Sequence, residues 1–247
     1  VSWSVNGVTS TVNTSMLTES DIPSPTSSDC DEAKVFVGWT TSPMDDTNDA
    51  PSPWYLSSSL VGTPINADIT YYAVFATVRE GLSDYYAIYS GSLTEGDYII
   101  FYSGKAMKNT VSSNRLQYEE KNPLNGIITN TNNTIIWHIA PSDSYWTIYN
   151  ADVNKYVAST QTNNQAQMLS SGTESKSLWI VSGTSTYNFV NKYSTDNNKN
   201  AYLRNNGTYG FACYAASTGD ALSLYKRLPN YSFSTFCPCD YTIDISN

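Results

Sequence analysis

The sequence contains a single histidine, His138, and this scarcity limits the chemistry available to the chain. Ser-His-Asp triads and many zinc sites depend on histidine, so one copy makes either hard to assemble. Gly-x-Ser-x-Gly elbows, Walker loops and paired-histidine helix motifs are also missing. The alternating run around His138 points it away from the side that Trp137 faces, so we interpret it as a structural residue. We therefore expect a protein that is not an enzyme, with no catalytic residues and no cofactor.

Long apolar runs and strong positive charge are absent as well. No run approaches the roughly 18 apolar residues of a membrane-spanning helix, so we expect a chain that does not span a membrane. Charged residues make up 14% of the chain, and the formal net charge is −9. Because nucleic-acid affinity comes largely from neutralising phosphates, no nucleic-acid partner is expected. The acidity is concentrated in residues 1–78, which hold nine acidic residues and one basic residue.

Cysteines are few, and they do not define a compartment. The four are Cys30, Cys213, Cys237 and Cys239, and a chain of this size does not need disulfides to fold. Cys237-Pro-Cys239 has one intervening residue where thioredoxin-like motifs have two, so we interpret the pair as structural. Bonds from this pair to Cys30 or Cys213, or free thiols, fit better than a strained bond within it. Because the sequence begins at Val1 without a signal peptide, we expect a mature region or a fragment of a longer protein.

The residues that are abundant predict an all-β protein of two domains. Twenty Tyr and six Trp supply enough apolar surface to exclude disorder. The weakly charged, Ser-, Thr-, Asn- and Gly-rich remainder favours sheets and turns over helices. At 247 residues, the chain is longer than one typical core, so two domains are the natural expectation.

Residues 1–78 read as a small β domain. An alternating run opens the chain and ends at Asn6-Gly7, a type I′ turn signal. Strand-like runs follow at 34–41, which contains Phe36, Gly38 and Trp39, and at 68–76, which contains Tyr72-Ala73-Val74-Phe75. This order resembles the Listeria–Bacteroides repeat, also called the internalin B-repeat, although a long insert around 43–60 departs from it. The resemblance implies a β-grasp-like stalk or adhesion module of a bacterial surface protein.

Residues 79–227 contain a threefold internal repeat of about 45 residues, and fifteen of the tyrosines. Strand–turn–strand segments begin at Asp97, Trp146 and Tyr187. A large residue in a later strand-like run marks each copy: Trp137, Trp179 and Tyr225, 42 and 46 positions apart. Three such copies predict a β-trefoil-like barrel in which these landmarks pack inside. Residues 228–247 are predicted to form a tail or an edge strand.

The segment Trp146-Thr-Ile-Tyr-Asn, followed by Lys155-Tyr-Val157, resembles the ricin-type lectin repeat, and the domain is similar to those of surface proteins of gut Bacteroidetes. The resemblance implies a sugar-binding fold. The position that carries an Asp in sugar-binding copies of the family is occupied here by Lys108, Ala158 and Arg204, which puts the family's own sugar site in doubt.

Two candidate sites follow from residue type. Aromatic rings stack on sugars and amides bond hydroxyls, so a carbohydrate site is predicted in the third copy, at Tyr202, Asn205, Tyr209 and Tyr214. Carboxylates in a flexible loop can bind calcium, and the candidates for a metal site are Asp45, Asp46 and Asp49. These acids lack EF-hand spacing, so a solvated acidic loop is the alternative.

The sequence is compatible with two functions. The main hypothesis is a non-catalytic adhesion or architectural module, extracellular or on the cell surface of a bacterium, whose partner is a glycan or a host or neighbouring surface protein. The alternative is a carbohydrate-binding module of a larger glycan-processing surface protein. We expect a monomer.

Overall fold

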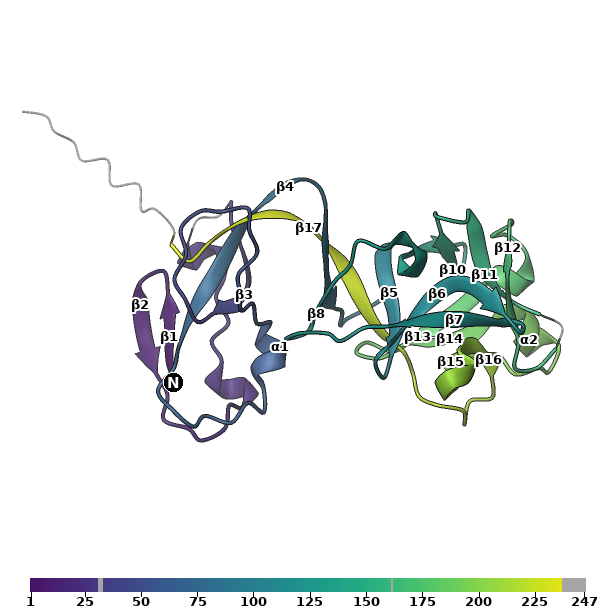
Figure 1. Ribbon diagram of the computed structural model, residues 1–247, viewed down its shortest axis with the longest axis horizontal. Helices are drawn as coiled ribbons and strands as arrows, with labels where there is room; N and C mark the ends of the chain where they lie inside the picture. Colours follow the sequence, from purple (N-terminus) through teal and green to yellow (C-terminus); the bar gives the residue numbers. More distant parts are fainter. Residues whose placement is uncertain (31–32, 161, 237–247) are drawn as a thin grey trace, which may run out of the picture. The chain divides into compact units, whose positions relative to one another are not determined.

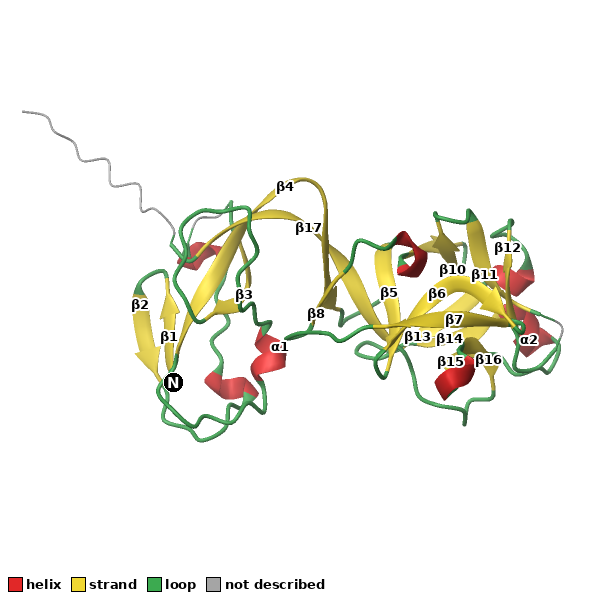
Figure 2. Ribbon diagram, in the orientation of Figure 1, coloured by secondary structure: helices red, strands yellow, loops and turns green. Residues whose placement is uncertain are grey.

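The structure, a computed structural model, describes residues 1–30, 33–160 and 162–236 (Figure 1). Strands dominate it, and its helices are short (Figure 2). The chain forms two compact units. The first unit comprises Val1–Ser83 together with the segment from Pro229 on, and the second unit comprises Asp84–Leu228. The chain therefore passes between the units twice, in β4 (Thr70–Ile88) and in β17 (Ser223–Ser234).

The first unit is built on a mixed sheet in the order β2-β1-β4-β3. Its other strands are β1 (Ser2–Val5), β2 (Val8–Thr11) and β3 (Val35–Thr40). The central pair, β1 and β4, is parallel, whereas β2 and β3 pair antiparallel at the two sides. Short helices lie in the connections: η1 (Glu19–Asp21), η2 (Ser27–Asp29) and α1 (Ser57–Leu60). The parallel central pair is joined through a long connection, as parallel strands require. The β-grasp-like assignment of this unit stays a prediction from the sequence.

Aromatic rings fill the core of the first unit. The ring of Trp3 lies 4.7 Å from that of Trp39 and 5.0 Å from that of Tyr71, measured between centroids. Gly38 explains the Phe-x-Gly-Trp pattern, because its φ is +139° and a Cβ there would lie 2.5 Å from the Tyr55 carbonyl oxygen. Only glycine meets both conditions.

The second unit contains three consecutive groups of four strands, one group for each copy of the repeat. The first group is β5 (Gly96–Tyr102), β6 (Lys105–Ser112), β7 (Arg115–Glu120) and β9 (Trp137–Ser142). The second is β10 (Tyr145–Asn150), β11 (Lys155–Ser159), β12 (Ala166–Leu169) and β13 (Trp179–Ser182). The third is β14 (Asn188–Asn191), β15 (Tyr202–Asn205), β16 (Phe211–Tyr214) and β17. Additional elements are β8 (Ile127–Thr129), η3 (Asn133–Ile135), η4 (Ser175–Ser177), α2 (Lys192–Asp196) and η5 (Gly207–Tyr209).

The first and last strand of each copy form a closed barrel. Pairing runs from β5 to β9, β10, β13 and β14 in turn. A bridge from Tyr187 to Leu222 joins the starts of β14 and β17, and β17 pairs with β5 to close the ring. The middle strands form three hairpins, β6–β7, β11–β12 and β15–β16. A six-stranded barrel with three hairpins is a β-trefoil-like fold, as the threefold repeat predicts.

The landmark residues of the repeat lie inside this barrel, but one of them is not the residue expected from the sequence. Trp137 pairs with Tyr98, Trp179 with Trp146, and Leu222 with Tyr187. All of these residues are fully buried except Trp146, which is partly buried against the same core. The third landmark is therefore Leu222 rather than Tyr225, and the landmarks are 42 and 43 positions apart. Tyr225 packs in a separate cluster with Tyr86 and Phe101. None of the helices among the described residues has the length and apolar character needed to cross a bilayer.

Candidate functional site

The four predicted sugar-binding residues lie in β15, β16 and the η5 turn between them. Tyr202 and Tyr214 stand directly opposite each other on the two strands. Tyr214 is 2% exposed and Asn205 is buried, whereas Tyr209 is 62% exposed. The structure thus brings Tyr202 and Tyr214 together, but it leaves Tyr209 as the ring most open to a ligand.

Two arginines pack on this aromatic cluster. The guanidinium carbon of Arg204 lies 5.0 Å from the ring centroid of Tyr202, and that of Arg115 lies 5.5 Å from that of Tyr209. Burial raises the pKa of the Tyr214 hydroxyl, and the nearby Arg115 charge opposes the rise. Cation–π contacts therefore occupy ring surface that a sugar would need. The cluster is more a packed surface than an open cleft, and sugar binding by these four residues stays a prediction.

The acidic loop that contains the predicted calcium ligands is held by other parts of the first unit. Lys34 Nζ lies 3.2 Å from Asp46 Oδ1. The amide N–H of Thr47 donates to the Phe233 carbonyl, and Ser232 Oγ lies 2.8 Å from Asn48 Oδ1. Throughout the described part of the chain, no three His, Cys, Asp or Glu residues gather closely enough to hold a metal ion. The structure gives the metal prediction for Asp45, Asp46 and Asp49 no support.

A polar pocket of about 240 Å³ lies on the outside of the barrel in the second unit. The residues that line it come from β5, β9, β17, η3 and the β10–β11 turn: Asp97, Asn133, Ile136, His138, Ala151, Asp152 and Arg227. We call it the His138 pocket. It combines two carboxylates, an amide, an imidazole and a guanidinium, so hydrogen-bond donors and acceptors share one small volume.

Strand pairing places the central residues of this pocket in a row. Asp97 lies opposite His138, and His138 lies opposite Tyr149. Tyr149 in turn lies opposite Tyr156 on β11, with the two ring centroids 4.9 Å apart. Directly paired residues project from the same face of a sheet. Because Trp137 and Ile139 are buried in the barrel, His138 between them points outward with its neighbours in the row.

The charged groups of the pocket are joined to one another. His138 Nδ1 lies 2.9 Å from Asp97 Oδ1, and His138 Nε2 lies 3.4 Å from Glu95 Oε1. Arg227 reaches the other oxygen of Asp97 at 3.5 Å. The guanidinium of Arg227 also lies 5.7 Å from the ring centroid of Tyr86, where burial raises the pKa of the phenol to about 12. The Asp97 carboxylate is therefore held from two sides, by the imidazole and by the guanidinium.

A buried amide network supports the opposite wall. Asn109 Nδ2 lies 2.9 Å from both Asn150 Oδ1 and Asp152 Oδ2. Asn150 is fully buried and donates from Nδ2 to the carbonyl oxygens of Asn133 and Ile136. These bonds tie the β10–β11 turn to η3, so the Asp152 and Asn133 edges of the pocket keep a fixed spacing.

This arrangement is suited to holding a polar ligand. Both ring nitrogens of His138 face carboxylates, which orient the imidazole. Among the described residues, neither nitrogen pairs with a serine or cysteine that it could activate. The sequence interpretation of His138 as structural therefore missed its place in a pocket. The sequence did indicate that His138 faces outward. It could not indicate the pairing with Asp97, because Asp97 lies 41 positions earlier in the chain.

Comparison with protein-family models finds no match, and no curated protein matches the sequence. Several solved structures resemble part of the chain at low identity. SeviL bound to asialo-GM1 saccharide is 17% identical over 54% of this chain and 98% of its own, with a TM-score of 0.40. The designed threefold protein ThreeFoil is 15% identical over 59% of this chain and 100% of its own, with a TM-score of 0.36. The Polyporus squamosus lectin is 14% identical over 55% of this chain and 50% of its own, with a TM-score of 0.38. The fold assignment therefore rests on the strand pairing described above.

Proposed function

We propose that the second unit is a carbohydrate-binding module and that the His138 pocket receives a sugar. The observation that carries the proposal is the set of donors and acceptors in the pocket. A sugar hydroxyl both donates and accepts, so it can donate to Asp97 or Asp152 and accept from Arg227 or His138. An apolar ligand would leave these groups desolvated without partners, at a cost in free energy.

The surroundings of the pocket support a sugar over other polar ligands. Tyr149 is the next residue in the row after His138, and Tyr156 follows it. Aromatic rings beside a polar pocket are the usual surface for the C–H face of a pyranose. The volume of about 240 Å³ is below the range of drug-sized ligand pockets, roughly 300–1,000 Å³, and favours a single sugar residue or the end of a chain.

The proposal includes binding without turnover. His138 and Asp97 form a pair, but the second nitrogen of His138 faces Glu95 rather than a nucleophile. Incubation of the intact chain with a bound glycan should leave that glycan uncleaved by mass spectrometry. Release of a shorter product by the wild type, lost in His138→Ala, would instead identify a hydrolase.

The setting that we propose is the outside of a bacterial cell. Cys30 is disulfide-bonded, and disulfides persist in oxidising compartments. Cys213 is a buried free thiol, and Cys237 and Cys239 lie outside the described residues. The resemblance of the first unit to the Listeria–Bacteroides repeat supports a surface protein in which this unit acts as an architectural or adhesion module. Glycan binding by the second unit would give such a protein its partner.

The test is a glycan array probed with the intact chain, followed by calorimetry on the glycans that bind. Asp152→Asn and His138→Ala should each weaken binding at least about tenfold, because each removes a group of the pocket. Asp143→Asn is the matched control, since Asp143 is an exposed aspartate in the neighbouring β9–β10 turn and does not line the pocket. Silence across the array, or equal losses in all three variants, would contradict the proposal.

A further inference from the structure

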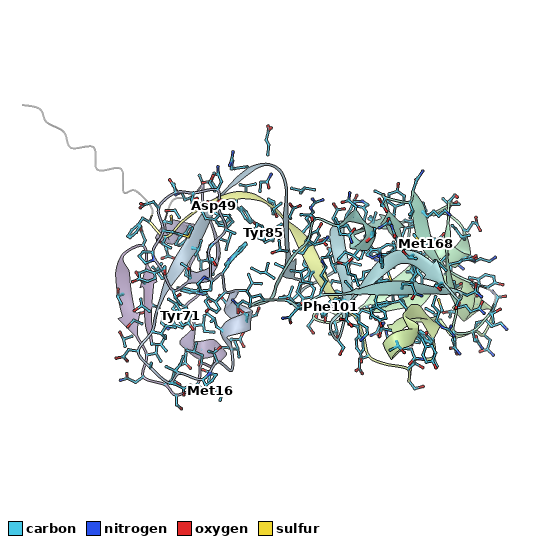
Figure 3. All side chains as sticks on the ribbon, viewed as in Figure 1. Met16, Asp49, Tyr71, Tyr85, Phe101 and Met168 are labelled. Atoms are coloured by element: carbon cyan, nitrogen blue, oxygen red, sulfur yellow. The ribbon has the colours of Figure 1, made fainter. Side chains whose placement is uncertain are left out.

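A second hollow, of about 330 Å³, lies beside the His138 pocket. Its walls come from β6, β12 and the start of β11 with the turn before it: Asn109, Val111, Val153, Lys155, Gln167 and Met168. We call it the Val153 hollow, and Met168 marks its β12 wall in Figure 3. Val111 and Val153 are both exposed apolar side chains, and Lys155 and Gln167 add polar groups beside them.

One turn supplies residues to both cavities. Ala151 and Asp152 line the His138 pocket, and the next residue, Val153, lines the second hollow. Consecutive Cα atoms are about 3.8 Å apart, so the two cavities lie on either side of a single peptide unit. Asn109 also connects them: it lines the Val153 hollow, and its Nδ2 lies 2.9 Å from Asp152 Oδ2 of the His138 pocket.

The two cavities differ in chemistry in a way that suits neighbouring parts of one ligand. The His138 pocket is charged and hydrogen-bonding, whereas the Val153 hollow presents valine and methionine surface with two polar groups at its edge. A pyranose ring has an apolar C–H face and a polar rim, so the first cavity suits hydroxyls and the second suits a ring face. Exposed apolar side chains gathered in a hollow are also a frequent mark of a binding site.

We propose that these cavities are two subsites for one oligosaccharide, which crosses the Ala151–Asn154 turn with one sugar residue in each. This inference rests on the proposed function and extends it: the ligand class is a glycan of at least two residues rather than a free monosaccharide. A terminal sugar occupies the His138 pocket, and the adjoining sugar lies against Val111 and Val153. Binding of the second residue adds contact area without a second cost in lost translational freedom.

The experiment compares a glycan identified on the array with the methyl glycoside of its terminal sugar, both titrated into the intact chain by calorimetry. The wild type should bind the glycan at least about tenfold more tightly than the methyl glycoside. Val153→Trp fills the hollow and should remove this difference, while binding of the methyl glycoside is unchanged. The matched control is Ile180→Trp, because Ile180 is 47% exposed where Val153 is 37% exposed, and it lines neither cavity.

The possible outcomes distinguish failure of the two-subsite arrangement from failure of the proposed function. Equal affinity for the glycan and the methyl glycoside in the wild type overturns the two-subsite arrangement and leaves the proposed function intact. A difference that survives in Val153→Trp overturns it as well. No binding to any glycan overturns the proposed function itself, and the inference with it. If circular dichroism shows that Val153→Trp does not fold, Val111→Trp fills the same hollow from β6 and takes its place in the comparison.

Discussion

Two buried asparagines occupy the same place in two copies of the barrel. Asn150 and Asn191 each end the first strand of a copy, and each donates to the carbonyl oxygen of the residue before the landmark Trp, Ile136 and Leu178 respectively. In the first copy the corresponding residue is Tyr102, whose hydroxyl donates to Asp220 instead. Each amide thus holds the turn before the last strand of the preceding copy, β9 for Asn150 and β13 for Asn191, which an apolar side chain could not do.

Replacement of Asn191 by alanine should therefore be costly. The change leaves the Lys176 carbonyl and the Ser194 N–H without partners in a buried setting, so we expect a loss of roughly 2–4 kcal/mol in the free energy of unfolding. Urea denaturation measures it. Asn122→Ala, at an exposed position before Pro123, should change the stability by less than about 0.5 kcal/mol. Equal losses of stability in the two variants would show that the buried amide of Asn191 contributes no more to stability than an exposed one.

Individual residues show what could be predicted from the sequence and what could not. Alternation around Trp137 correctly gave the outward facing of His138, because period-2 patterning is local. The pocket itself depends on which strands are neighbours, and β9 lies between β5 and β10 in the barrel. Tyr214 and Asn205 show a similar limit. Their types suited a sugar site, yet tertiary packing buries them.

At the scale of elements, the hairpins of the first and third copies meet backbone to backbone. Phe211 at the start of β16 pairs with Leu116 of β7. Gly210, the residue before this pair, has a φ of +85°, and a Cβ there would clash with the Leu116 carbonyl oxygen. The approach of these two hairpins therefore requires a residue without a side chain.

Gly210→Ala should accordingly destabilise the barrel more than an alanine at Gly207, a neighbouring glycine that also has a positive φ. Gly207 has a φ of +58° with nothing within 4 Å of a built Cβ, so Gly207→Ala should cost only the left-handed strain, roughly 1–2 kcal/mol. Gly210→Ala adds the clash, and we expect at least twice that loss. Urea midpoints of the two variants give the comparison, and a smaller loss at Gly210 would mean that the hairpins separate without cost.

The strands of the barrel also explain why the sequence predicts the repeat correctly but places its third landmark at the wrong residue. Large aromatic residues at Trp137 and Trp179 made the period visible, and Tyr225 was the nearest aromatic residue in the third copy. The barrel needs a buried apolar side chain at that place rather than an aromatic one, and Leu222 supplies it opposite Tyr187. The repeat in the sequence was enough to predict the fold class. The register of the third copy could be determined only from the strand pairing in the structure.

At the scale of the whole molecule, buried tyrosine is a property that the two units share. The pKa of the hydroxyl is raised by burial at Tyr71 in the first unit and at Tyr187 and Tyr225 in the second. Burial raises the pKa of Tyr86 and of Tyr98 further, to about 12. Both rings are fully buried. Each of these groups resists ionisation in the folded chain but not in the unfolded chain, where the pKa returns to about 10.

The sign of the resulting pH dependence follows from proton binding. Below pH 10 these tyrosines are protonated in both states, so their contribution to stability is complete. Between pH 10 and 12 the unfolded chain releases protons that Tyr86 and Tyr98 retain when folded, and the stability falls as pH rises through this window. Ionisation of these tyrosines should therefore not change the urea midpoint of unfolding up to about pH 9.5. Above that pH it should lower the midpoint steeply.

Tyr86→Phe isolates one contribution to this fall. Its hydroxyl is buried and makes no hydrogen bond among the described residues, so the change should leave stability near neutral pH unaltered or slightly higher. Near pH 12, the variant should be more stable than the wild type by roughly 2 kcal/mol, because the ionisation of one phenol no longer favours the unfolded chain. Tyr209→Phe, at a 62% exposed ring, should follow the wild-type curve instead. If the midpoints of Tyr86→Phe and the wild type fall together with pH, ionisation of this phenol does not drive the alkaline unfolding, and the destabilising protons leave from other groups.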